Sequence, residues 1–125
     1  MSNMSESESE LRMYLVVRDD LNLPLGKAMG QAGHAFATAL INLYKKCPEK
    51  VNQYYQCNQP KIIVKCKNET ALLRTEQECI NLKLNYFLVI DAAKTIFTEP
   101  TKTCIAIGPC TRKELPKYIQ KMQLL

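Results

Sequence analysis

The stretch that decides the fold is RMYLVVRDDLNLPLGKAMGQAGHAFATAL, residues 12–40. Residues 12–18 are rich in β-branched and aromatic side chains and end at two aspartates, which is typical of a buried strand. After a turn at 21–24, small and apolar residues predict a long helix over 25–46, closed by Cys47 and Pro48. This strand and helix begin the order of elements from which we infer the fold class.

The rest of the chain continues this alternation of strand and helix. We expect strands over 61–67, 86–90 and 103–107, and a helix over 69–82. The last segment, 111–122, predicts a helix with two alternative starts: Thr111 and Glu114 match a capping box, whereas Pro116 favours a start near Glu114. The order βα(α)βαββα indicates an α/β fold with a mixed four-stranded sheet flanked by helices.

Length and composition indicate one soluble domain, and its charge is compatible with a polyanionic partner. The 125 residues leave room for one core, which we place at 12–125, after an acidic Ser/Glu tail over 1–11 that we expect to be disordered. Three of the 12 acidic residues lie in the first ten positions, so the remainder carries 17 basic and 9 acidic residues, a charge of +8. This charge makes a polyanionic partner plausible, although many basic domains bind no such partner. No apolar run approaches the roughly 20 residues of a membrane helix.

The cysteines indicate neither a zinc site nor a disulfide scaffold. The chain has one histidine and six cysteines, none in CxxC spacing, so we expect no metal and no cofactor. The first ten residues also differ from a secretory leader, which needs basic residues followed by an apolar stretch. We therefore expect reduced thiols and a cytoplasmic location.

A narrow polar stripe follows the long helix. At 100° per residue, Lys27, Gln31, His34 and Thr38 fall within roughly 60° of one another on a helix of small and apolar residues. Close packing of the small residues would enclose part of the stripe, and enclosed polar groups need partners. The alternative is a solvated face with a structural histidine.

A second candidate site lies where the third strand ends. Asp91 closes the apolar run at 86–90, and it is followed along the chain by Thr95, Thr101 and Thr103. Ligands of α/β proteins bind beyond the carboxyl ends of strands. If the first and third strands are parallel neighbours, Lys27 and Asp91 face one crevice and form an acid, base and electrostatic set. The alternative is that Asp91 is an ordinary turn residue and that the threonines reflect β-propensity.

Several enzyme classes lack their motifs in this chain. No phosphate-binding P-loop, GxSxG nucleophile elbow, HExxH zinc site or GxGxxG dinucleotide loop occurs in the sequence.

The ordered set of motifs resembles one known family, the archaeal and eukaryotic peptidyl-tRNA hydrolases. The resemblance covers nearly all of 12–125 and rests on VVRDDL (16–21), GKAMGQAGHA (26–35), KIIVK (61–65), DAAKT (91–95), TKTCIAIGP (101–109) and the terminal QLL (123–125). It implies a mixed four-stranded sheet flanked by helices and hydrolysis of the ester between a peptide and the 3′-terminal ribose of tRNA, without metal or cofactor. The catalytic residues that it implies are Lys27, Asp91, Thr95 and Thr103.

The resemblance also suggests how the substrate is held. The partner it implies is peptidyl-tRNA, and the residues that we expect to contact it are Arg18, Gln31, His34, Lys94 and Lys102. No membrane contact is expected, and a homodimer is left open. Leu25, Ala93 and Pro100 depart from the family pattern, so the alternative function is a member that binds tRNA or another RNA without hydrolysing it.

Overall fold

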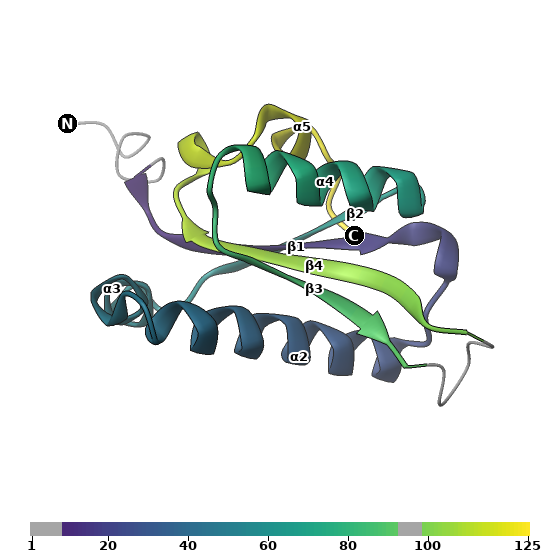
Figure 1. Cartoon of the computed structure of the whole chain (residues 1–125), viewed down its shortest axis with the longest axis horizontal. Coiled ribbons are helices and arrows are strands. Elements are labelled where there is room, and N and C mark those ends of the chain that lie inside the picture. The colour runs from purple at the N-terminus through teal and green to yellow at the C-terminus, as the bar shows by residue number, and fades with distance from the viewer. Residues whose placement is uncertain (1–8, 93–98) are drawn as a thin grey trace.

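The computed structural model describes residues 9–92 and 99–125, in which one sheet lies between two helical layers (Figure 1). The helices α2 and α3 cover one face of the sheet, and α4 and α5 cover the other. In chain order the elements are β1 (Arg12–Arg18), a 3-10 turn (Asp19–Leu21), α2 (Leu25–Tyr44), α3 (Pro48–Gln56), β2 (Lys61–Cys66), α4 (Glu69–Asn81), β3 (Tyr86–Asp91), β4 (Thr101–Cys110), a 3-10 turn (Arg112–Glu114) and α5 (Lys117–Gln120). The predicted α/β class and its order of elements are confirmed.

The sheet is mixed, with the strand order β2-β1-β4-β3. Strand β1 pairs in parallel with β2, and β4 runs antiparallel to both β1 and β3. The strands β1, β2 and β3 therefore point the same way, and their carboxyl ends lie at one end of the molecule. However, β4 separates β1 from β3, so the neighbouring arrangement that we considered for these two strands does not occur.

The continuous apolar run of β1 is explained by helices on both of its faces. Tyr14 and Val16 belong to the core beneath α4 and α5, whereas Met13 and Leu15 belong to the core beneath α2 and α3. Successive side chains of a strand alternate between faces, so a strand that is covered twice needs apolar residues at nearly every position.

The C-terminal segment departs from the single predicted helix. The capping box of Thr111 and Glu114 is present, but it caps a 3-10 turn, and α5 begins only after Pro116. A proline in a second helical turn would remove a backbone hydrogen bond, which explains the division into two short pieces.

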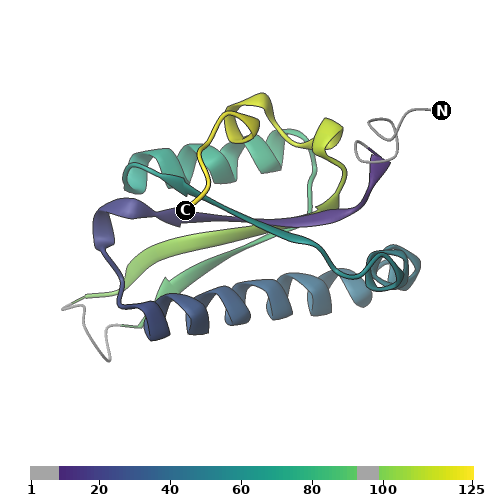
Figure 2. The same ribbon diagram turned by 180° about the vertical axis from the view of Figure 1, so that it is seen from behind.

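The last three residues pair with β2, the edge strand beside them in Figure 2. The Lys65 amide donates to the Gln123 carbonyl at 3.0 Å, and the Leu125 amide donates to the Ile63 carbonyl at 3.1 Å. This pairing covers part of an edge that would otherwise expose unpaired backbone groups.

At the N-terminus, residues 1–8 of the predicted tail lie outside the described residues. Of the remainder, Glu10 forms an ion pair with Arg12 at 3.1 Å, and Leu11 packs against the core beneath α2.

Asn85, which directly precedes β3, links α2 to the sheet. Its side-chain amide donates to the carbonyls of Ala39 at 3.0 Å and Gly108 at 2.8 Å. We predict that Asn85→Ala lowers the free energy of unfolding by about 1–3 kcal/mol, because two partly buried carbonyls lose a donor. Urea denaturation measures the change. Asn52→Ala, at an exposed position of α3, is the matched control and should stay within about 0.5 kcal/mol of the wild type.

Candidate functional site

Lys27, Gln31 and Asp91 meet where β3 ends against the first turns of α2. The Lys27 Nζ lies 2.6 Å from the Asp91 Oδ2, and the Gln31 side-chain amide donates to the same oxygen at 2.9 Å. Asp91 and Gln31 are each only 8% exposed. The structure therefore brings together two of the predicted catalytic residues and one predicted substrate contact, although Gln31 and Asp91 lie 60 positions apart in the chain.

Helix spacing and strand alternation explain how these three side chains meet. Lys27 and Gln31 are four residues apart, which places them on the same side of α2. Val89 belongs to the core beneath α2, and Asp91, two residues later, points to the same face of the sheet. Since α2 packs along β3 and β4, its first turns lie over this end of the sheet.

Within the cluster, the positive charge of Lys27 balances the negative charge of Asp91. A buried carboxylate is costly unless it is paired and hydrogen-bonded, and Lys27 and Gln31 provide a counter-charge and a donor. The side chain of Lys27 remains 25% exposed, and it lines the open pocket together with Asp91. The Gln31 Oε1 is buried and meets no donor among the described residues. The cluster therefore offers a carboxylate, an ammonium group and an open acceptor in one place.

Thr103 sits at an irregular point of β4, beside the site. Val89 pairs with Cys104 but Ile90 pairs with Lys102, so β4 holds one extra residue, Thr103, between these pairs. Such bulges re-aim side chains and are common near active sites. The Thr103 side chain is fully buried, and its hydroxyl donates to the Cys104 Sγ at 3.8 Å. The structure thus places Thr103 two residues after Thr101, the strand partner of Asp91, but the Thr103 hydroxyl contacts the sulfur of Cys104.

Cys104 is not suited to act as a nucleophile at this place. Burial raises the pKa of its thiol to about 11, so the group is protonated at neutral pH.

The Arg18 side chain forms hydrogen bonds within the protein. Its guanidinium donates two hydrogen bonds to Asp20, at 3.1 and 2.8 Å, and one to the Lys102 carbonyl at 3.1 Å. The hydrogen bonds from Arg18 lower the pKa of Asp20. Arg18 therefore joins the end of β1 to the start of β4 and positions the strand that carries Lys102. The predicted residues Lys94 and Thr95, and with them Ala93, lie outside the described residues.

His34 lies on α2 beyond Gln31 and stacks on Phe87 of β3, with ring centroids 5.6 Å apart and an interplanar angle of 29°. It lines an open pocket of about 400 Å³ whose walls also include Gly26, Lys27, Gly30, Gln31, Val89, Ile90, Asp91 and Ala92. Phe87 was not singled out from the sequence, because one aromatic residue within an apolar strand carries no distinguishing signal.

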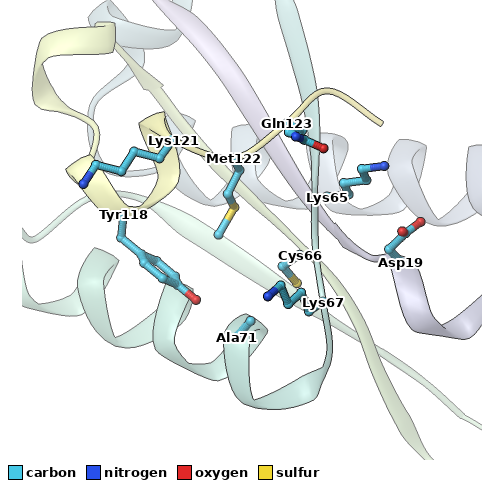
Figure 3. Close-up of a pocket in the computed structure, with 9 residues that line it drawn as sticks. All are labelled: Asp19, Lys65, Cys66, Lys67, Ala71, Tyr118, Lys121, Met122 and Gln123. Carbon is cyan, nitrogen blue, oxygen red and sulfur yellow. The ribbon is translucent and has the colours of Figure 1, made fainter.

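A larger hollow of about 480 Å³ lies beneath α5 (Figure 3). It is lined by Asp19, Lys65, Cys66, Lys67, Ala71, Tyr118, Lys121, Met122 and Gln123. Cys66 belongs to the core beneath α4, whereas Asp91 faces α2, so this hollow opens on the opposite face of the sheet. It contains none of the predicted site residues.

Within residues 9–92 and 99–125, no three side chains of the metal-ligating types come together in an arrangement that could hold a metal ion. None of the helices in this part of the chain combines the length and the apolar character needed to span a bilayer.

Comparison with known proteins identifies the family. The sequence model of the family described as Peptidyl-tRNA hydrolase PTH2 matches residues 11–125. The chain belongs to this family. Similar proteins include "Peptidyl-tRNA hydrolase" of Thermococcus sibiricus, 32% identical over 91% of this chain and 97% of that protein, and "Peptidyl-tRNA hydrolase" of Methanocaldococcus jannaschii, 30% identical over 92% and 100%.

Mammalian relatives of the PTH2 family are longer. "Peptidyl-tRNA hydrolase 2, mitochondrial" of Homo sapiens is 35% identical over 80% of this chain and 56% of the human protein. The chain therefore spans a little over half the length of that relative.

The ion pair between Lys27 and Asp91 can be tested by stability alone. We predict that Lys27→Met and Asp91→Asn each lower the free energy of unfolding by about 1–3 kcal/mol, because each change removes the counter-charge of a largely buried group. The double variant should lose less than the two single losses added together, by about 1 kcal/mol or more. Thermal and urea unfolding of all four proteins measure this coupling. Simple additivity would show that the two side chains do not interact in solution.

Proposed function

We propose that this protein hydrolyses the ester bond between peptide and tRNA in peptidyl-tRNA and so releases the tRNA for reuse. The observation that carries the proposal is the contact of Lys27, Gln31 and Asp91 in an open pocket at the carboxyl end of β3. Membership of the PTH2 family supports the choice of substrate. In the proposed ester hydrolysis, only side chains of the protein and water take part.

In the proposed reaction, Asp91 orients or deprotonates a water molecule that attacks the ester carbonyl. The ammonium group of Lys27, a side chain that is 25% exposed, lies 2.6 Å from Asp91 and stabilises the oxyanion that develops on the carbonyl oxygen. The new bond joins the water oxygen to the carbonyl carbon, the bond to the ribose oxygen breaks, and that oxygen takes up a proton. The proposed hydroxyl donors are Thr95, outside the described residues, and Thr103, whose hydroxyl would have to turn from the Cys104 Sγ toward the substrate.

The tRNA part of the substrate is proposed to bind basic residues around this end of the sheet. Lys102 lies in β4 next to Thr103, and Lys94 belongs to the connection that follows Asp91. Phosphate contacts by lysine add affinity through counterion release, and the charge of +8 on residues 11–125 favours approach of a polyanion. We propose the cytoplasm as the compartment, because all six cysteines are free and four are buried, as suits a reducing environment.

The first functional prediction concerns turnover. We expect Lys27→Ala and Asp91→Ala each to lower kcat for N-acetyl-aminoacyl-tRNA by about 100-fold or more while the fold is retained, because acid-base and oxyanion contributions reach that size. Purified variants are assayed in EDTA, with circular dichroism as the check on folding. Wild-type turnover in either variant contradicts the assignment. A wild-type protein that binds the tRNA without cleaving it supports the non-catalytic alternative.

The second functional prediction concerns the tRNA surface. We expect Lys102→Glu, and likewise Lys94→Glu, to raise KM and to flatten its dependence on salt, with a much smaller effect on kcat, because phosphate contacts act mainly on binding. Lys46→Glu makes the same charge change at an exposed position beyond the other end of α2 and serves as the control. If the three variants share one KM and one salt slope, this end of the sheet does not bind the tRNA.

A further inference from the structure

The outer strand of the sheet, β3, exposes an uncharged edge. It pairs with β4 on one side, and on the other side it pairs with no strand among the described residues (Figure 1). Its sequence, YFLVID, carries no charge before Asp91. Proteins usually protect such edges with charges, prolines or covering segments, because a free strand edge can pair with another extended chain. A bare edge that ends at the proposed site points to an extended ligand.

The helix beside this edge is also uncharged on its exposed side. Among its 20 residues, α2 has one Lys, Arg, Asp or Glu residue, which is Lys27. The exposed positions along the helix are occupied instead by Leu25, Gly26, Met29, Gly30, Gly33, His34, Ala37, Ile41, Asn42 and Tyr44. An exposed helix face normally carries charged residues, and a long apolar face marks an interaction surface.

The strand and the helix are held side by side along their length. Asp91 contacts Lys27 and Gln31 at one end, Phe87 stacks under His34 in the middle, and the Asn85 side chain reaches the Ala39 carbonyl at the other end. The pocket of about 400 Å³ lies between them, with Gly30 and His34 on one wall and Val89 and Ile90 on the other. Both elements therefore lead into the Lys27 and Asp91 site.

The Gln31 side chain provides a buried hydrogen-bond acceptor at the end of this pocket near Lys27 and Asp91. Gln31 is 8% exposed and lines the pocket, and its Nε2 donates to Asp91. Because a carboxylate only accepts hydrogen bonds, the amide must present Nε2 to Asp91 and keep Oε1 for another donor. That oxygen meets no donor among the described residues. A buried unsatisfied acceptor calls for a ligand donor, such as a peptide N–H.

We propose that the free edge of β3 and the uncharged face of α2 bind the peptide portion of the substrate as an extended chain that runs parallel to β3. The peptide carboxyl end, which carries the ester, lies at Lys27 and Asp91, and its terminal amide N–H donates to the Gln31 Oε1. The rest of the chain follows β3 back toward Tyr86. This inference rests on the proposed function, since it assigns one part of the same substrate to a surface.

The dimensions suit a short peptide. Gly30 and Ile41 are 11 residues apart on α2, which is about 16 Å along the helix axis. An extended chain of about five residues covers the same length. Strand addition supplies backbone hydrogen bonds that do not depend on peptide sequence, as a general peptidyl-tRNA hydrolase requires.

The observations favour a peptide over RNA or a second copy of the chain. RNA binds through phosphates, and the single cationic side chain of α2, Lys27, is held by Asp91. A second copy packed along α2 would cover Gly30 and His34 and close the pocket that the tRNA end must enter.

The experiment compares two substrates with the same ester: N-acetyl-alanyl-tRNA and N-acetyl-pentaalanyl-tRNA. We expect kcat/KM to be roughly 2- to 10-fold higher for the longer substrate, the effect of one or two added backbone hydrogen bonds. In a parallel pair, alternate residues direct their N–H groups to the same neighbour. Methylating the backbone nitrogens of one alternate set should therefore abolish the gain, whereas methylating the other set should not.

A matched pair of variants tests the α2 face. Ile41 of α2 and Ile80 of α4 are isoleucines on helices, 55% and 48% exposed, on opposite faces of the sheet. We expect Ile41→Glu to reduce the ratio of kcat/KM for the longer over the shorter substrate toward one, because it places a carboxylate beside the peptide. Ile80→Glu should keep the wild-type ratio. Thermal unfolding confirms that both variants fold.

The outcomes separate this inference from the proposed function. Failure to cleave N-acetyl-alanyl-tRNA overturns the function itself. Cleavage of both substrates at equal kcat/KM, or equal effects of the two methylation sets, overturns only the proposal that the peptide binds along β3 and α2. If Ile41→Glu instead converts a dimer into a monomer by light scattering and leaves the ratio intact, the α2 face belongs to a second copy.

Discussion

The buried carboxylate of Asp91 is the constraint on which the site depends. A carboxylate that is 8% exposed must be matched by a counter-charge and donors, and these come from two positions one turn apart on α2. This requirement fixes both the rotation and the axial position of α2 against β3. The amide of Asn85 fixes the other end of the same contact. The distance between helix and edge strand, and hence the width of the pocket, follows from these two points.

One face of the sheet carries the candidate site, and the other carries mainly apolar core. The face covered by α2 carries the charged cluster, the stacked ring of His34 and the open pocket. The face covered by α4 and α5 holds the core around Tyr14, Ile105 and Ile107, and the C-terminal residues close part of the β2 edge there. Stabilising contacts on that side allow the α2 side to keep features that cost stability, such as an unsatisfied acceptor and an uncovered edge.

The uncharged surface beside the site has a physical logic. Charged side chains on the edge of β3 and on the outer face of α2 would increase the solubility of the protein. The chain has 17 basic and 12 acidic residues, but few of them lie on these two surfaces. Lys102 lies instead in β4 beside the site, at the end of the sheet where we propose that the tRNA binds. An uncharged helix face and strand edge suit the peptide part of the proposed substrate.

Much of this protein was determined by local sequence. The bounds of β1 follow from its β-branched and aromatic residues and the aspartates after it, and the helix after Asn68 follows from its N-cap and helical spacing. The shared face of Lys27, Gln31 and His34 follows from the helical repeat, which acts over a few residues. Tertiary structure alone decided that β4 lies between β1 and β3, that Thr103 is an extra residue in β4, that Arg18 clamps Asp20 and the Lys102 carbonyl, and that Phe87 lies under His34. These features depend on which distant segments become neighbours. Pairing between distant strands is chosen by the packing of the whole chain, and no local pattern records it.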